Sequence, residues 1–352
     1  MKTCRIYLII ASVIVISNSC KNNSKNNLEY IEPAFDEVIN MDVKVLNGSF
    51  VFSNGQISVV DTLIIYGGMT NISNKAFHLF SKNTGKYITS FGNIGRAKAE
   101  ISSAYNRFSI DKERRMMYVY DLNRAKVVCF SLDKVLLGDN DYAHDIMLPK
   151  IVNKTVSNQF IYLKNSFLVG HTSSGRFLVC SESDSITCND FYPSLDEPQE
   201  FKNVERQYFF YMGCMAARPD GNLFVYATRS GCIMEIWKNH EKTISPYIIK
   251  GLFKPEYNSR YREMPAPLVT IKEDAPHGIS MLTCSNQHIY AIYNDLPGYI
   301  SNKIAVFDWN GKPQKIYIVN KDLGGFDVDE DNNIYALALS DDNIELVTIH
   351  SN

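Results

Sequence analysis

Short apolar runs alternate with polar turns along most of the chain, and the same pair of runs recurs. The turns are rich in Asn, Asp, Gly and Ser, which adopt tight-turn dihedral angles at little cost. The earlier runs of the repeats span 63–66, 116–120, 167–170, 223–226, 289–293 and 334–339, and the later runs span 77–80, 127–130, 177–180, 233–237, 304–307 and 346–349. No segment keeps its apolar residues at helical spacing, so the pattern predicts an all-β protein.

The repeats have the length of propeller blades. Successive later runs lie about 50, 50, 56, 71 and 41 residues apart, a period that suits a four-stranded blade of a β-propeller. Six such repeats fit between residues 28 and 352. The sequence therefore predicts a six-bladed β-propeller over 28–352.

The last repeat lacks an outer strand, because the chain ends shortly after the run 346–349. An uncovered strand edge exposes unpaired backbone groups and favours aggregation. The segment 38–46 is extended, partly alternating and without a partner nearby in the sequence. We expect this N-terminal strand to join the last blade and close the ring.

The first 27 residues read as a targeting segment. Lys2 and Arg5 precede the apolar run 6–16, which is too short to span a bilayer. The sequence Ser-Asn-Ser before Cys20 resembles a bacterial lipobox, in which the cysteine is lipidated and becomes the new N-terminus. This predicts a signal peptide over 1–19 and a lipidated Cys20, and a plain secretory signal is the alternative.

Residues 20–27 predict a flexible tether between a lipid anchor and the propeller. The segment 21–27 is polar and has no apolar residue. Lys21 stands where an inner-membrane retention signal would place Asp, and no acidic run of the kind that marks surface export follows. We therefore expect attachment to the outer membrane facing the periplasm, with the cell surface as the alternative.

Composition narrows the classes of partner. The chain is 45% hydrophobic and 21% charged, with a formal net charge of −2. Ordinary globular composition argues against disorder, and the lack of a basic excess argues against a nucleic-acid partner. The expected contacts are the membrane, through the N-terminal lipid, and a protein, peptide or glycan partner.

The cysteines suggest one disulfide. No CxxC pair occurs, which disfavours a zinc or thioredoxin-like site. A hairpin centred on Asp184 would place Cys180 opposite Cys188, and an exported protein meets oxidising conditions. The alternative is that both are small apolar strand residues.

Two stretches resemble a known family. Residues 95–101 occupy the place of a Gly-x-Gly-Pro-Gly-Glu-Phe stretch, with Gly95 and Glu100 matching and 97–99 departing. The segment 306–336 is similar to the closing blades of the same family. On these residues the chain resembles the TolB-like six-bladed propeller lipoproteins of certain Gram-negative anaerobes. The resemblance implies the fold and the envelope location, and it carries over no catalytic residue.

The long connections between blades are candidate binding loops. They span about 92–106, 138–158, 191–208 and 250–276, and long loops on a rigid scaffold often carry function. Their Arg and Tyr side chains can contact carboxylates, sugars or peptides, or else pack on the propeller rim. Arg96 and Glu100 could form a local ion pair instead, and Arg218 and Arg229 read as solvated turn charges. The candidate ligand-binding residues are Arg96, Glu100, Tyr257, Arg260, Tyr261, Arg262 and His277.

Metal and catalytic motifs are weak. Asp327, Asp329 and Asp331 alternate as in a calcium loop, but Asn332 replaces the expected Gly and the closing Glu is missing. A serine near His171 is better explained as part of a turn. We expect no resident metal, no cofactor and no catalytic residue.

These features favour a binding or scaffold lipoprotein over an enzyme. The alternative is a metal-dependent propeller hydrolase or lyase, similar to lactonases. That chemistry needs acidic and amide ligands converging on the central channel. Only Asp111 and Asp327 stand near the ends of expected inner strands.

Overall fold

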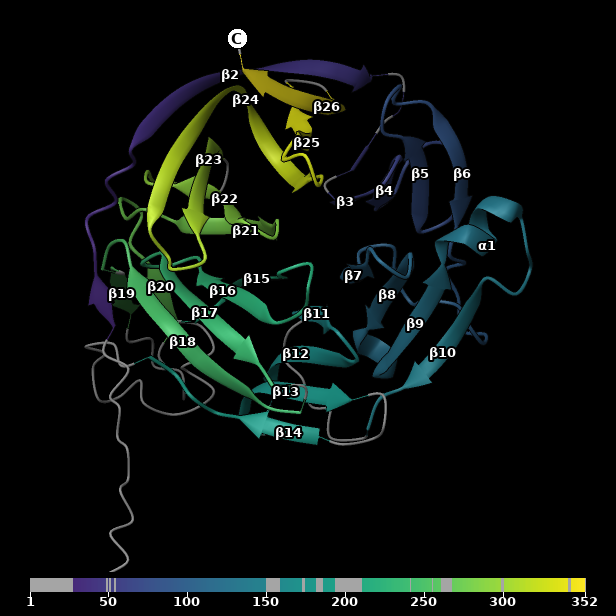
Figure 1. Cartoon of the computed structure of the whole chain (residues 1–352), viewed down its shortest axis with the longest axis horizontal. Coiled ribbons are helices and arrows are strands. Elements are labelled where there is room, and N and C mark those ends of the chain that lie inside the picture. Colours follow the sequence, from purple (N-terminus) through teal and green to yellow (C-terminus); the bar gives the residue numbers. More distant parts are fainter. Residues whose placement is uncertain are drawn as a thin grey trace, which may run out of the picture.

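The computed structural model describes residues 28–352 apart from 49, 51, 54, 150–158, 173–174, 182–185, 194–210, 241, 255, 261–267, 299–300, 341–342 and 352. The described strands form a ring of twisted sheets around a central opening (Figure 1). The expectations for residues 1–27, including lipidation of Cys20, lie outside the described residues.

Each blade is an antiparallel sheet whose first strand lines the centre and whose last strand lies at the rim. Blades 1 and 2 are β3 (Gln56–Val60), β4 (Leu63–Gly67), β5 (Phe77–Ser81) and β6 (Tyr87–Phe91), then β7 (Phe108–Asp111), β8 (Met116–Asp121), β9 (Lys126–Ser131) and β10 (Ala143–Met147). Blades 3 and 4 are β11 (Phe160–Leu163), β12 (Ser166–Thr172), β13 (Gly175–Ser181) and β14 (Ile186–Asn189), then β15 (Gly213–Ala217), β16 (Leu223–Thr228), β17 (Ile233–Asn239) and β18 (Ile244–Gly251).

Blades 5 and 6 share one long strand. Blade 5 is β21 (Gly278–Cys284), β22 (His288–Asn294), β23 (Ser301–Asp308) and the first half of β24 (Pro313–Val328). Blade 6 is the second half of β24, then β25 (Ile334–Leu339), β26 (Ile344–Ser351) and β2 (Glu37–Asn47). The described strands therefore form six four-stranded blades, as the sequence predicts.

The N-terminal strand closes the ring. β2 pairs antiparallel with β26 and so supplies the missing outer strand of blade 6, which confirms the expected closure. Its first half also pairs in parallel with β24 at the rim of blade 5. The short β1 (Glu29–Tyr30) pairs in parallel with β18 of blade 4. Residues 29–47 therefore run along the outer edges of three blades, covering strand edges that would otherwise be exposed.

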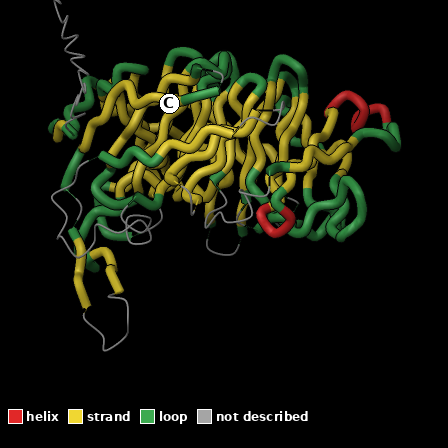
Figure 2. The backbone as a smooth tube through the Cα atoms, turned by 90° about the horizontal axis from the view of Figure 1, so that it is seen from below, coloured by secondary structure: helices red, strands yellow, loops and turns green. Residues whose placement is uncertain are grey.

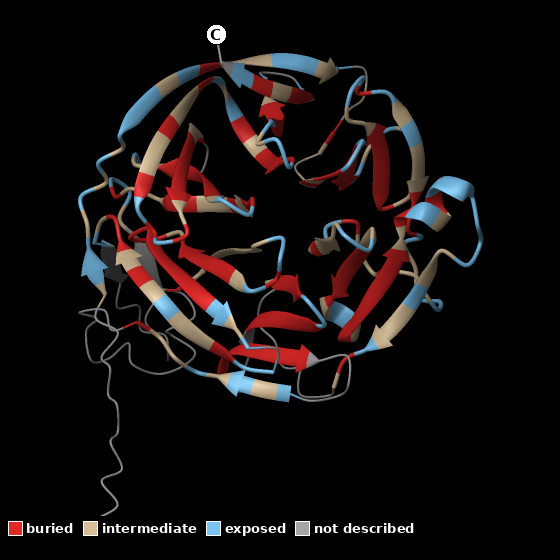
Figure 3. Cartoon of the chain, in the orientation of Figure 1, coloured by how far each residue is buried: buried red, intermediate tan, exposed pale blue. Residues whose placement is uncertain are grey.

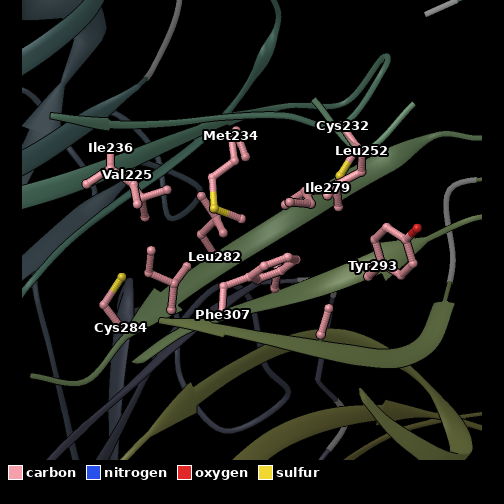
Figure 4. Close-up of a cluster of buried hydrophobic side chains, with 14 of the residues drawn as sticks. Val225, Cys232, Met234, Ile236, Leu252, Ile279, Leu282, Cys284, Tyr293 and Phe307 are labelled. Carbon is pink, nitrogen blue, oxygen red and sulfur yellow. The ribbon is translucent and has the colours of Figure 1, made fainter. Parts of the chain in front are cut away.

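Apolar side chains fill the interfaces between neighbouring blades, and Figure 3 shows that most residues of the middle strands are buried. One cluster lies between each pair of blades, including blades 6 and 1, where Leu337 meets Phe80. Figure 4 shows the cluster between blades 4 and 5, where Met234 faces Phe307 and Leu282. Because each blade packs only on its two neighbours, the ring is stable only when it is closed.

One of these interfaces contains a buried ion pair. Arg176 of β13 and Glu235 of β17 are both fully buried between blades 3 and 4. The Arg176 Nη1 and Nη2 groups donate to the Glu235 Oε2 and Oε1 atoms at 2.7 and 2.6 Å. The rings of Phe177, Tyr192, Tyr211 and Tyr226 lie within 5.2 Å of the guanidinium carbon. This closed arrangement gives the pair both hydrogen bonds and cation–π contacts.

The inner strands all begin at one face, which we call the loop face, because the connections between blades lie there. Two glutamines join neighbouring blades at this face: the Gln56 side chain donates to the Phe108 carbonyl at 2.8 Å, and the Gln159 side chain donates to the Gly213 carbonyl. At the opposite face, the turn face, Lys112 donates to the Val328 carbonyl at 3.2 Å. The first residues of an inner strand therefore lie beside the first residues of the next inner strand, and the last residues lie beside the last.

The longest connection contains a hairpin. β19 (Tyr257–Arg260) pairs with β20 (Leu268–Ile271), and the hairpin projects beyond the loop face (Figure 2). The described helices are η1 (Leu122–Arg124) and α1 (Leu132–Leu137). Neither is long or apolar enough to cross a membrane.

The expected disulfide is wrong. In the hairpin of β13 and β14, Cys180 pairs with Ile186 and Leu178 pairs with Cys188. The two cysteines are therefore diagonal neighbours, and diagonal positions lie about 7–8 Å apart, too far for the usual geometry of a disulfide. The described cysteines form no disulfide. A shift of the hairpin centre by one residue, which sequence spacing does not resolve, accounts for the difference.

Candidate functional site: the central channel

The inner strands enclose a channel of about 340 Å³. Its wall is mixed, with apolar side chains such as Ile161, Met215 and Leu282 between polar ones. Arg107 and Cys214 line it towards the loop face, and other charged side chains line it towards the turn face. The volume lies at the small end of the range for small-molecule pockets.

At the turn face three buried or partly paired carboxylates, those of Asp327, Asp220 and Asp111, already have partners. Asp327 is 5% exposed, and its Oδ2 atom accepts hydrogen bonds from the Ser58 hydroxyl at 2.8 Å and the Val59 N–H at 2.7 Å. Its Oδ1 atom accepts from the Thr283 hydroxyl. The Lys112 Nζ atom lies 4.0 Å from Oδ2. Asp327 thus ties the inner strand of blade 6 to those of blades 1 and 5, so its oxygen atoms are occupied by the fold.

Two further carboxylates at this face are held locally. Arg218 donates to both Asp220 oxygen atoms, at 2.8 and 2.6 Å. Although partial burial opposes it, the hydrogen bonds from Arg218 and Asn222 hold the pKa of Asp220 below its ordinary value. Asp111 accepts the backbone N–H of Arg114 at 3.0 Å. The turn face therefore presents charge that is largely neutralised.

The loop-side mouth is different. Arg107 lies just before β7 and Arg229 lies just after β16, and both are half-buried. Neither forms an ion pair or a side-chain hydrogen bond with any residue that the structure describes, and the Arg229 Nε atom is buried without an acceptor among them. Burial, together with the positive charge of Arg229, lowers the pKa of Arg107. An arginine starts from so high a pKa that Arg107 stays charged near neutral pH.

Cys214 and His277 lie within electrostatic range of these arginines. Burial raises the pKa of Cys214 to about 12, against the opposing effects of Arg229 and Arg107. A thiol with so high a pKa is no nucleophile near neutral pH, because the thiolate is the reactive form. Burial and the neighbouring Arg229 lower the pKa of His277. The loop-side mouth is therefore positive and lacks an activated nucleophile among the described residues.

The structure separates the predicted site residues. His277 lies at the loop-side mouth, as a member of the loop leading into β21. Tyr257 and Arg260 lie on β19, in register with Ile271 and Leu268. Tyr261 and Arg262 lie outside the described residues.

The expected local ion pair between Arg96 and Glu100 is wrong. Arg96 is exposed, and the Glu100 carboxylate accepts the backbone N–H of Ala97 at 2.7 Å instead. Arg124 donates to the carbonyls of Ala97 and Glu100 at 3.4 and 3.2 Å. Glu100 and Arg124 therefore shape the first long loop, and the loop needs no Arg96 contact to do so.

The candidate metal ligands do not converge. Among the described residues, no three His, Cys, Asp or Glu side chains are grouped as a metal site would require. Asp329 accepts hydrogen bonds from the backbone of Asp331 and Asn333 and pairs with Lys82 at 3.0 Å. The side chain of His171 and the serines that follow it lie outside the described residues.

Sequence reasoning missed the two arginines that dominate the loop-side mouth. It named Arg229 only as a solvated turn charge, and that interpretation is wrong because the side chain is half-buried. It did not name Arg107. The available signal was the position of Arg107, at the end of a long loop and directly before an inner strand.

Comparison with known proteins places the chain in a family. A member of the DUF4221 family from Bacteroides vulgatus ATCC 8482 matches with a TM-score of 0.55 at 7% identity, over 93% of this chain and 100% of that chain. A protein assigned as exported from Bacteroides fragilis NCTC 9343 matches with a TM-score of 0.50 at 12% identity, over 90% and 99%. Both identities are low enough that these likenesses concern the fold alone.

No curated protein matches the sequence. A family model described as a TolB-like 6-blade propeller matches residues 34–331. This range holds most of the described blades, from the N-terminal strand to the inner strand of blade 6. The chain therefore belongs to the TolB-like six-bladed propeller family.

Proposed function

We propose that this protein is a lipid-anchored binding module of the bacterial outer membrane, which holds a peptide, glycan or protein partner at the loop face of its propeller. One observation carries the proposal. The two mouths of the channel differ: acids and bases neutralise each other at the turn face, while Arg107 and Arg229 at the loop face have no counter-charge among the described residues. Charged groups without partners at a mouth are available to a ligand.

The alternative of a metal-dependent hydrolase has less support. A propeller hydrolase of that kind needs oxygen ligands converging in the channel around one cation. The acidic candidate Asp327 already accepts three hydrogen bonds from blades 1 and 5. Two positive side chains at the loop-side mouth would also repel a divalent cation.

The binding function is tested by thermal unfolding of residues 28–352, which contain the six described blades and the N-terminal strands β1 and β2. Peptides, glycans and divalent cations are added separately. A ligand that binds the folded state stabilises it by about 2.7 kcal/mol at a hundredfold excess over its Kd. A shift with a peptide or glycan supports the proposal. A stoichiometric divalent cation in the purified protein would favour the hydrolase instead.

The anchor is tested in cells. Full-length protein is labelled with an alkyne-bearing fatty acid, and the membranes are then separated by density. We expect label in the outer-membrane fraction and none in a Cys20→Ala variant. Label on the Cys20→Ala protein, or recovery of the wild type as a soluble protein, would contradict a lipid anchor at Cys20.

A further inference from the structure

The loop-side mouth holds two half-buried arginines that have no carboxylate partner among the described residues. Six arginines are buried or half-buried in the part of the chain that the structure describes. Arg115, Arg176 and Arg218 pair with carboxylates, and Arg124 donates to two carbonyls. Arg107 and Arg229 are the two that have neither kind of partner among the described residues.

We propose that Arg107 and Arg229 bind an oxyanion, which is a carboxylate, phosphate or sulfate group of a small ligand entering the central channel. This inference rests on the proposed binding function and specifies the chemistry of the ligand. A guanidinium presents a planar fork of donors that matches the two oxygen atoms of such a group. Two guanidiniums that repel each other gain further when an anion lies between them.

The surroundings favour an anion at this position. Cys214, within range of both arginines, stays a neutral thiol because burial raises its pKa to about 12. Burial and Arg229 lower the pKa of His277, so this imidazole is held towards its neutral form. The neighbours described here therefore bring no negative charge that would compete with the ligand.

The channel limits the size of the ligand. Its volume of about 340 Å³ admits a body the size of a sugar or a few residues. Arg107 lines this space together with apolar residues of β11, β15 and β21, and Arg229 lies beside it, where its backbone N–H donates to the Met212 carbonyl at 2.9 Å, directly before β15. The ligand is therefore a small molecule, or the end of a larger one, with an acidic group at the mouth and its body in the channel.

Calorimetry on the full-length lipoprotein in a nonionic detergent at low salt tests the proposal. The probes are inorganic phosphate, sulfate, glucuronate and N-acetyl-triglycine, with glucose and N-acetyl-triglycine amide as neutral counterparts of the last two. We expect at least one anion to bind and its neutral counterpart not to bind. Hydrogen bonds to charged groups are worth enough that Arg107→Gln and Arg229→Gln should each weaken binding about tenfold or more.

Arg218→Gln is the matched control, because it removes the same charge from the other mouth of the same channel, where Asp220 already pairs with it. We expect this variant to bind within about twofold of the wild type. Circular dichroism and thermal unfolding confirm that each variant is folded. Preference among the four anions then distinguishes an inorganic ion from an acidic sugar or a peptide carboxylate.

Three results would overturn the proposal. The first is binding of none of the four anions. The second is anion binding that Arg218→Gln weakens as much as Arg107→Gln does. That result would indicate attraction by the overall positive charge of the channel rather than a site at Arg107 and Arg229. The third is binding of glucose or N-acetyl-triglycine amide that neither arginine variant affects. The third result leaves the proposed binding function standing, so the two ideas can fail separately.

Discussion

Two arginines that each precede a phenylalanine have opposite surroundings in this propeller. Arg107 lies in Asn-Arg-Phe and Arg176 lies in Gly-Arg-Phe, and both are near the start of a strand. Arg176 is fully buried and bound to Glu235. Arg107 is half-buried and has no carboxylate partner among the described residues.

The difference follows from the position of each strand within its blade. β13 is the third strand of blade 3 and faces β17 across a closed interface, where burial of an unpaired charge would be prohibitive. β7 is an inner strand, and Arg107 lines the channel rather than an interface between blades. An arginine in the interface thus serves the fold, whereas the arginine at the channel belongs to the binding site that we propose.

The largest expected effect is the loss of stability when the buried ion pair of Arg176 and Glu235 is broken. Glu235→Gln should lower the free energy of unfolding by about 3–5 kcal/mol, because it leaves the buried Arg176 charge uncompensated. At present Glu235 raises the pKa of Arg176, although burial alone would lower it. Urea unfolding measures the change. A loss below about 1 kcal/mol would mean that water or another group reaches Arg176.

Removing both charges should cost less than removing one. Arg176→Met with Glu235→Leu keeps apolar volume and leaves no unpaired charge, so we expect it to recover most of the stability lost in Glu235→Gln. The same urea titrations compare the variants. A double variant no more stable than Glu235→Gln would show that the contacts of Arg176 with the surrounding rings, rather than the ion pair, hold this interface.

Arg107→Gln should change the free energy of unfolding by less than about 0.5 kcal/mol, in either direction. The substitution removes no described ion pair and relieves repulsion from Arg229. Unfolding in phosphate-free buffer measures this. A loss comparable to that of Glu235→Gln would place Arg107 in the structural framework and remove the contrast between the two arginines.

The smallest expected effect is on the pKa of His277, which lies near Arg229. Arg229→Gln should raise the pKa of His277 towards its ordinary value of about 6.5, because it removes the charge that, after burial, lowers it. Nuclear magnetic resonance of the imidazole measures the titration. Arg218→Gln, at the other mouth, should leave it unchanged, and an equal shift in both variants would contradict a local effect of Arg229.

The lowered pKa of His277 also determines how the stability of the fold depends on pH. The pKa of His277 is lower in the folded state than in the unfolded chain. Its contribution to stability is therefore complete above about pH 6.5 and is lost as the pH falls through the folded pKa. Arg229→Gln should make this acid loss smaller.

Much of the fold could be predicted from the sequence, because each blade repeats a local pattern of apolar runs and turns. The strand 38–46 could be assigned to the last blade because that blade otherwise lacked an outer strand. The parallel pairing of its first half with blade 5 has no comparable signal. The pairing of Cys180 was also beyond reach, since one residue of register decides which side chains are opposite each other.

Less of the candidate site could be predicted. His277 was named because it ends the longest loop, and the structure places it directly before β21, within electrostatic range of Arg229. Arg107 and Arg229 are more than one hundred residues apart in the chain, and they become neighbours only when blades 2 and 4 close around one axis. Nothing near either residue in the sequence indicates the other.

The repeating strands, their grouping into blades and the strand that closes the ring follow from the sequence, because they depend on local periodicity and on the need to cover edges. Which charges are paired follows only from the closed ring. Glu235 is 59 residues from Arg176, yet pairs with it across an interface, while Arg107 and Arg229 come only within electrostatic range of each other. Pairing depends on which strands of neighbouring blades face each other, and that is a property of the closed ring rather than of any one repeat.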